Sequence, residues 1–140
     1  MVSPPWIPVM NVIFQDLQAP ENPLNGSPLD ASGVNGLLSS CRDRPPFLFE
    51  LKAENGALLT VGLGGEFGAA QYGSDTGLPP FLMATADGGG GDESTVEFWA
   101  RGVPTRVLKR YCLAVEKLQE VVGKFLEDGT RLDGVRWEEI

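Results

Sequence analysis

The stretch Phe47–Leu63, FLFELKAENGALLTVGL, predicts a β-hairpin around which the rest of the chain can be placed. Bulky apolar residues alternate with a mixed set from Phe47 to Ala53, as in a strand that buries at least one face. Asn55-Gly56 is a turn pair favoured where both central residues take a positive φ. Ala57–Leu63 then supplies the returning strand. The hairpin predicts an antiparallel sheet at the centre of the fold.

Further strands are predicted on both sides of this hairpin. They are Val9–Gln15, Glu66–Tyr72 (weakened by Gly68), Phe81–Ala86, Thr95–Ala100 and Thr105–Cys112, the last two joined by residues 101–104. Two helices are predicted, one from a cap at Ser32 to about Arg42 and one from about Ala114 to Asp128, with Gly129 at its left-handed end. Residues 1–31 form a strand and an irregular loop. Together these elements predict a single α+β domain over residues 1–140, with a mainly antiparallel sheet and two helices covering one face.

The composition excludes several classes of partner. The chain has 140 residues and a formal net charge of −8, whereas proteins that bind DNA, RNA or anionic membranes need clustered Lys and Arg. No apolar run is long enough to cross a bilayer. Residues 1–10 lack the basic start and apolar core of a secretion signal. We expect a cytoplasmic protein that binds neither nucleic acid nor membrane.

The charge is unevenly distributed along the chain. All 11 basic residues lie in Arg42–Lys52 or Arg101–Arg136, so the stretch Ala53–Ala100 contains none. Its seven acidic residues are Glu54, Glu66, Asp75, Asp87, Asp92, Glu93 and Glu97. A segment of one sign can attract a cationic partner and raise its association rate. The alternative is an acidic surface that serves only solubility.

Residues that usually carry catalysis are scarce. The sequence contains no histidine, which removes the commonest general base and most zinc and iron sites. The glycine runs at 62–68 and 88–91 lack the spacing of a dinucleotide or phosphate loop. Cys41 and Cys112 match no metal spacing and are interpreted as buried thiols, with a disulfide between them as the alternative. We expect no catalytic residue, metal or cofactor.

Aromatic residues beside the acidic stretch suggest a protein-binding surface. Tyr72, Phe98 and Trp99 lie in or next to it, and aromatic residues flanked by charge are typical of binding hot spots. Because Phe98 and Trp99 are adjacent in one strand, they must point to opposite faces of the sheet. One of the two is expected in the core.

Several short segments resemble a known family. They are Phe81-Leu82-Met83-Ala84, Val96-Glu97-Phe98-Trp99, Gly102-Val103-Pro104-Thr105, the helix from Val115-Glu116 to Phe125-Leu126 ending at Gly129, and the terminal Gly134-Val135-Arg136-Trp137-Glu138-Glu139. This set resembles the immunity-protein family numbered one of bacterial polymorphic toxin systems, over roughly Val34 to Ile140. The resemblance implies an α+β protein that binds a cognate toxin domain and neutralises it. The accompanying toxins are often nucleic-acid deaminases, whose cleft must hold a polyanion and is therefore expected to be basic.

We interpret the chain as a non-catalytic immunity protein that occludes the active site of a cognate deaminase toxin. The candidate contact residues are Glu50, Glu54, Glu66, Tyr72, Asp75, Asp87, Asp92, Glu93 and Trp99. Two alternatives stay open: a small enzyme that depends on paired carboxylates, and a scaffolding module that associates through an open sheet edge.

Overall fold

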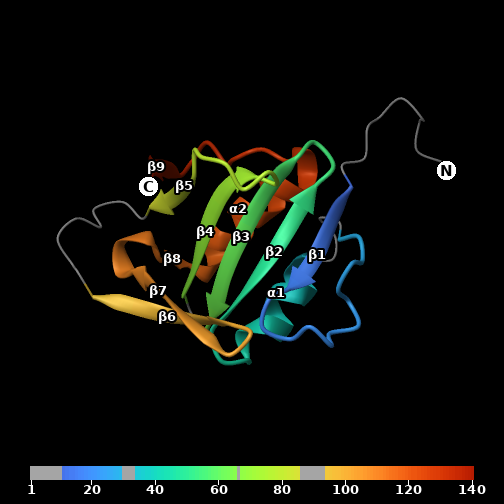
Figure 1. Cartoon of the computed structure of the whole chain (residues 1–140). Coiled ribbons are helices and arrows are strands. Elements are labelled where there is room, and N and C mark those ends of the chain that lie inside the picture. Colours follow the sequence, from blue (N-terminus) through green and yellow to red (C-terminus); the bar gives the residue numbers. More distant parts are fainter. Residues whose placement is uncertain (1–10, 30–33, 66, 86–93) are drawn as a thin grey trace.

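The central hairpin forms as the sequence predicts. A computed structural model describes residues 11–29, 34–65, 67–85 and 94–140 (Figure 1). Strand β2 (Phe47–Ala53) pairs antiparallel with β3 (Ala57–Gly64). The turn differs in detail from the prediction, because Gly56 alone has a positive φ, of 89°. Its N–H donates to the carbonyl of Ala53 at 3.0 Å, so a single left-handed glycine closes this hairpin.

The described residues contain one nine-stranded sheet and two α-helices. Besides β2 and β3, the elements are β1 (Val12–Asp16), α1 (Val34–Arg42), β4 (Phe67–Ser74), β5 (Leu82–Thr85), β6 (Thr95–Ala100), β7 (Val103–Leu108), the 3-10 helix η2 (Lys109–Tyr111), β8 (Leu113–Ala114), α2 (Val115–Asp128) and β9 (Arg136–Glu139). The strand order is β7-β6-β2-β3-β4-β5-β9, while β1 also pairs with β2 and β8 with β4. Every pair is antiparallel except β2 with β6. The predicted α+β class is confirmed. The predicted cap at Ser32 lies outside the described residues.

Both helices pack against the same face of the sheet, behind it in Figure 1. Leu118, Val121 and Phe125 of α2 join Phe49 and Val61 of the sheet in the main core, all of them at most 1% exposed. Gly68 explains how α2 comes so close to β4. A Cβ at this position would collide with the side chain of Leu118. Gly68 weakens the prediction of a strand, but its missing side chain leaves the space in which α2 packs against β4.

One end of the other face is covered by the hairpin of β6 and β7 together with η2. Phe98 is fully buried there, and a Cβ at Gly62 would lie 2.8 Å from its ring. The second core cluster consists of Ala69, Met83, Phe98, Tyr111 and Cys112. Trp99 points to the opposite face and is only half-buried. The expectation that one of the two adjacent aromatic residues lies in the core is confirmed.

The β6–β7 hairpin is tighter than predicted. Its turn consists of Arg101 and Gly102 alone, with φ values of 51° and 76°. Two consecutive positive φ values mark the type of turn whose twist matches that of the flanking strands. The sequence places Pro104 in the connection between the two strands. In the structure it belongs to β7, where it is paired with Trp99 of β6. The strand predicted to run to Cys112 ends at Leu108 and continues as η2.

The C-terminal tail is a strand of the sheet, which the sequence pattern did not predict. Strand β9 pairs antiparallel with β5 from Arg136 to Glu139. The indole Nε1 of Trp137 donates to the carbonyl of Leu132 at 3.1 Å. Glu138, the next residue, accepts two hydrogen bonds at its Oε1 atom. The guanidinium of Arg110 donates one at 3.0 Å and the hydroxyl of Tyr111 the other at 3.2 Å. The Trp-Glu pair of the tail therefore holds β9 from both faces of the sheet.

The described part of the chain has no helix that is long and apolar enough to cross a membrane. Cys41 and Cys112 are free and buried, as expected. Burial raises the pKa of both thiols, so they are poorly reactive in the folded protein.

Candidate functional site

The structure separates the described candidate contact residues into four places, one of them Trp99 in β6. Glu54 and Asp75 lie at one end of the central sheet, in the β2–β3 turn and just after β4. Glu50 lies in the middle of β2 and is half-buried. Tyr72 is on the opposite face of the sheet, toward α2. The candidates Glu66, Asp87, Asp92 and Glu93 lie outside the described residues.

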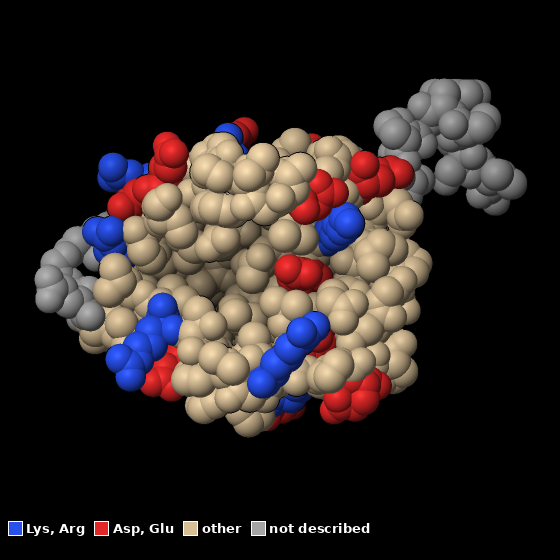
Figure 2. All heavy atoms as spheres, viewed as in Figure 1, with Lys and Arg blue, Asp and Glu red and all other residues tan. Residues whose placement is uncertain are grey.

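The stretch Ala53–Ala100 contains no basic residue, but basic side chains from other parts of the chain lie beside its acidic residues. Lys52 of β2 lies 3.9 Å from a carboxylate oxygen of Asp75, and Arg106 of β7 lies 3.6 Å from Glu97. Both pairs are exposed and are screened by solvent, so each contributes little to stability. Figure 2 shows acidic and basic side chains interspersed around the margin of the visible face. Neighbouring strands therefore weaken the single-sign field expected from the sequence.

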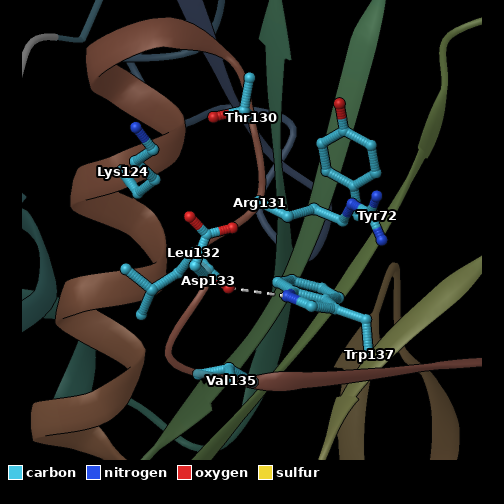
Figure 3. A pocket seen from close by; sticks show the side chains of 8 residues that line it. All are labelled: Tyr72, Lys124, Thr130, Arg131, Leu132, Asp133, Val135 and Trp137. Carbon is cyan, nitrogen blue, oxygen red and sulfur yellow. Dashed lines mark hydrogen bonds between the residues drawn. The ribbon is translucent and has the colours of Figure 1, made fainter.

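Tyr72 lines a pocket of about 450 Å³ between α2, the segment after it and β9 (Figure 3). Its hydroxyl donates to the carbonyl of Gly129 at 3.1 Å. Its ring makes edge contacts with Phe125 and Trp137 at centroid distances of 6.1 and 6.2 Å. The guanidinium carbon of Arg131 lies over the same ring, 5.6 Å from its centroid. Tyrosine, tryptophan and arginine are the residue types enriched in binding hot spots.

Of the residues that line this pocket, the sequence predicted only Tyr72 as a contact residue, whereas Arg131 and Trp137 were not among the candidates. A second hollow of about 410 Å³ lies on the other side of the Tyr72–Arg131 pair and includes Asn55 and Leu82. Lys124 of the first pocket is engaged by Asp128, with 2.7 Å between Nζ and Oδ2. Arg131 could have been proposed from its position two residues after Gly129, which ends α2. The segment that follows α2 places Arg131 over the ring of Tyr72 in β4.

Trp99 lies away from both of these sites. Within β6 it is paired in register with Phe47 of β2 and with Pro104 of β7. Its backbone N–H donates to the carbonyl of Pro46 at 3.0 Å. It lines neither of the two pockets described above that contain Tyr72. As a contact residue, Trp99 stays a prediction.

Glu50 belongs to a row of polar side chains that sequence reasoning did not assemble. The strand registers place Gln15 opposite Glu50, Glu50 opposite Thr60, and Thr60 opposite Gln71. Residues directly opposite each other share a face of the sheet. We call the four residues the polar row, and the face that carries them, opposite α1 and α2, the open face. All four are half-buried.

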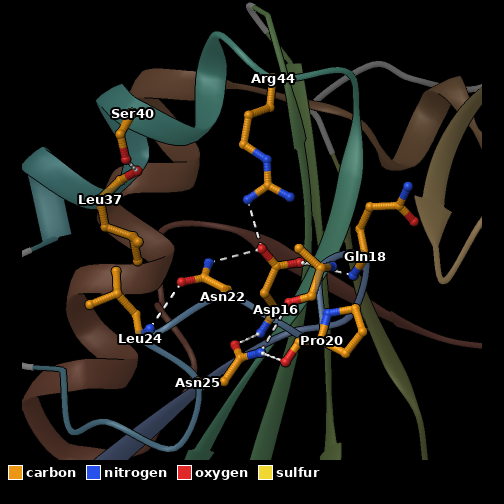
Figure 4. Close-up of polar contacts among 10 residues, drawn as sticks. Asp16, Gln18, Pro20, Asn22, Leu24, Asn25, Leu37, Ser40 and Arg44 are labelled. Carbon is orange, nitrogen blue, oxygen red and sulfur yellow. Dashed lines mark hydrogen bonds and ion pairs between the residues drawn. The ribbon is translucent and has the colours of Figure 1, made fainter.

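The one fully buried carboxylate of the described residues is structural. Asp16, which is 1% exposed, accepts hydrogen bonds from the backbone N–H groups of Gln18 and Ala19 and from the amide of Asn22 (Figure 4). Arg44 completes the set at 2.7 Å. Burial alone would raise the pKa of Asp16, but these hydrogen bonds outweigh it and the pKa is lowered. A carboxylate held ionised with all its partners in place does not have the raised pKa of a general acid.

The ranges that the structure describes hold no cluster of metal-binding side chains. No group of three or more His, Cys, Asp or Glu side chains is placed to hold a metal ion there. The other carboxylate with a shifted pKa is Asp128, whose pKa is lowered by Lys124 and Thr130.

Comparison with known families shows to which class of protein this α+β fold belongs. The model of the family described as Immunity protein Imm1 matches residues 29–139. The chain belongs to this family. It is therefore an immunity protein, and an immunity protein implies a cognate toxin as its partner. Among curated proteins, none matches the chain.

Proposed function

We propose that this immunity protein binds the active-site cleft of a cognate toxin and blocks it without catalysis, and that the toxin is a nucleic-acid deaminase. The observation that carries the proposal is the family match over residues 29–139 in a chain of net charge −8. A deaminase must hold a polyanion beside its zinc-activated water. An acidic protein competes for the same basic cleft.

The proposal gives a role to carboxylates rather than to any reacting group. Glu50, Glu54 and Asp75 are the described candidates for contact with basic side chains of the toxin, and Glu66, Asp87, Asp92 and Glu93 extend the set outside the described residues. The protein would act in the cytoplasm of the producing cell, where the toxin is made, and would bind neither nucleic acid nor membrane itself.

The direct test needs the cognate toxin domain, which is to be sought first in the gene next to that of the immunity protein. The purified domain is assayed for base deamination on single-stranded DNA, duplex DNA and RNA, alone and with rising amounts of the immunity protein. We expect deamination that falls to background at a one-to-one ratio, and mutually exclusive binding of nucleic acid and immunity protein to the toxin. A toxin domain that acts on another substrate, or that stays active in the complex, contradicts the proposal.

A further inference from the structure

The open face of the sheet combines unpartnered polar side chains with half-buried apolar ones. Both helices lie on the opposite face. None of the four side chains of the polar row forms a hydrogen bond or ion pair with the described part of the chain, although each is half-buried. Polar side chains at this degree of burial usually satisfy their hydrogen-bonding capacity with protein or water.

The register extends the row beyond these four residues. Gln71 is opposite Met83 of β5, and Met83 is opposite Glu138 of β9. With strands about 4.8 Å apart, the polar row from β1 to β4 spans roughly 14 Å. This is a suitable width for one helix or one extended segment of a partner.

An apolar margin lies along one side of the row. Ile13 and Leu58 are half-buried on the same face, in the register line next to the polar row, with the exposed Lys52 between them. A Cβ at Gly73 would lie 3.3 Å from the ring of Phe81, so this half-buried ring lies against the glycine at the sheet surface. A polar centre beside aliphatic and aromatic side chains has the composition of an interface rather than of ordinary solvated sheet.

Charge determines which partner this face fits. Glu50 is the one acidic residue of the polar row, and its carboxylate has no ion pair within the described residues. Figure 2, which views this side of the sheet, shows charged side chains mainly toward the margin and a hollow beside β4. Lys52 lies on the same face but pairs with Asp75, and the neighbours of Glu50 within the row are neutral hydrogen-bonding groups. A carboxylate in this position is complementary to a lysine or arginine side chain.

We propose that the open face is the toxin-binding surface, and that a cationic side chain of the toxin is received by Glu50 between Gln15, Thr60 and Gln71. This inference rests on the proposed function for the identity of the partner, and adds the surface and its central residue. The pocket around Tyr72 and Arg131, on the opposite face, is the competing surface.

The test measures binding of the cognate toxin domain to charge-reversal variants. Glu50→Lys should weaken binding by about 100-fold, because like charges placed together in an interface are strongly unfavourable. Glu127→Lys makes the same change on an exposed position of α2 and should change the dissociation constant less than about threefold. Arg131→Ala should have an equally small effect. Thermal unfolding of each variant confirms that it is folded.

A second measurement avoids charge altogether. The native thiols are buried, so an added surface cysteine can be labelled selectively. A bulky maleimide on Gln71→Cys should abolish binding of the toxin domain, whereas the same label on Glu127→Cys should leave it intact. Normal binding by labelled Gln71→Cys and by Glu50→Lys, with loss of binding in Arg131→Ala, overturns the assignment. Binding of the wild-type protein without inhibition would contradict occlusion alone, and no wild-type binding would overturn both proposals.

Discussion

Asp16 shows how a single residue can organise a segment that has no regular structure. The loop after β1 has few apolar residues to anchor it. The carboxylate of Asp16 accepts hydrogen bonds from this loop in place of the backbone pairs of a regular element. Asn25 contributes from the far end of the loop, because its side-chain oxygen accepts the backbone N–H of Asp16 at 2.6 Å. Arg44 connects this loop to the start of β2 and also stacks 3.7 Å above the ring of Phe47.

Replacing Asp16 with asparagine should destabilise the protein by about 2 kcal/mol at pH 7, since it removes the charge that Arg44 faces in a buried site. Urea unfolding measures the difference. The control is Asp43→Asn, at an exposed neighbouring position, which should stay within about 0.5 kcal/mol of wild type.

The comparison of wild type with Asp16→Asn also predicts a pH dependence. Because the pKa of Asp16 is lowered in the folded state, its contribution is fully present above the unfolded pKa of about 3.9. It is lost as the pH falls through the lower folded value. The stability gap between the two proteins should therefore close below about pH 4. A gap of constant size down to pH 2 would show that Asp16 does not act through its charge.

Gly68 offers a further prediction at the scale of one residue. Gly68→Ala should cost about 1–3 kcal/mol, because the added methyl group meets Leu118 and displaces α2. Gly123→Ala is the matched control. It lies within α2, where an added Cβ would have no neighbour within 4 Å, and should stabilise the protein by up to about 1 kcal/mol. Thermal unfolding of the two variants should therefore shift in opposite directions.

At the scale of elements, the tail of the chain illustrates the limit of reading segments separately. β9 has four residues, of which two are acidic, and this composition predicts no strand. It forms because β5 presents an unpaired edge and because Trp137 and Glu138 each find partners on a different face. The Trp-Glu pair, part of the segments that carry the family resemblance, thus fixes β9 as the last strand of the sheet. β1, by contrast, adds a strand outside the family match, which begins at residue 29.

The β6–β7 turn supplies a prediction for an element. Arg101 takes a left-handed conformation, which costs a non-glycine residue about 1 kcal/mol. Arg101→Asn should recover about 0.5 kcal/mol, since asparagine tolerates this conformation. Gly102→Ala, at the next position, should instead destabilise by about 1 kcal/mol. Equal stabilities of the two variants in urea unfolding would contradict the type of turn described.

At the scale of the whole molecule, charge acts over longer distances than any contact. The net charge of −8 should attract a basic toxin domain before the surfaces touch. We expect the association rate with that domain to fall at least about 10-fold between low and high salt, while the dissociation rate changes little. Stopped-flow mixing measures both rates. An association rate that is independent of salt would contradict electrostatic attraction.

The sequence by itself determined the alternation of β2 and β3, the helical face of α2 and the class of the fold, because these depend on periodicity within one segment. It also indicated the family, through short segments spread over the chain. Only the tertiary structure decided that Tyr72 and Glu50 lie on opposite faces, and that Lys52 and Arg106 lie beside acidic residues. The physical reason is that strand register brings together residues that are distant in sequence, and no local pattern encodes that pairing.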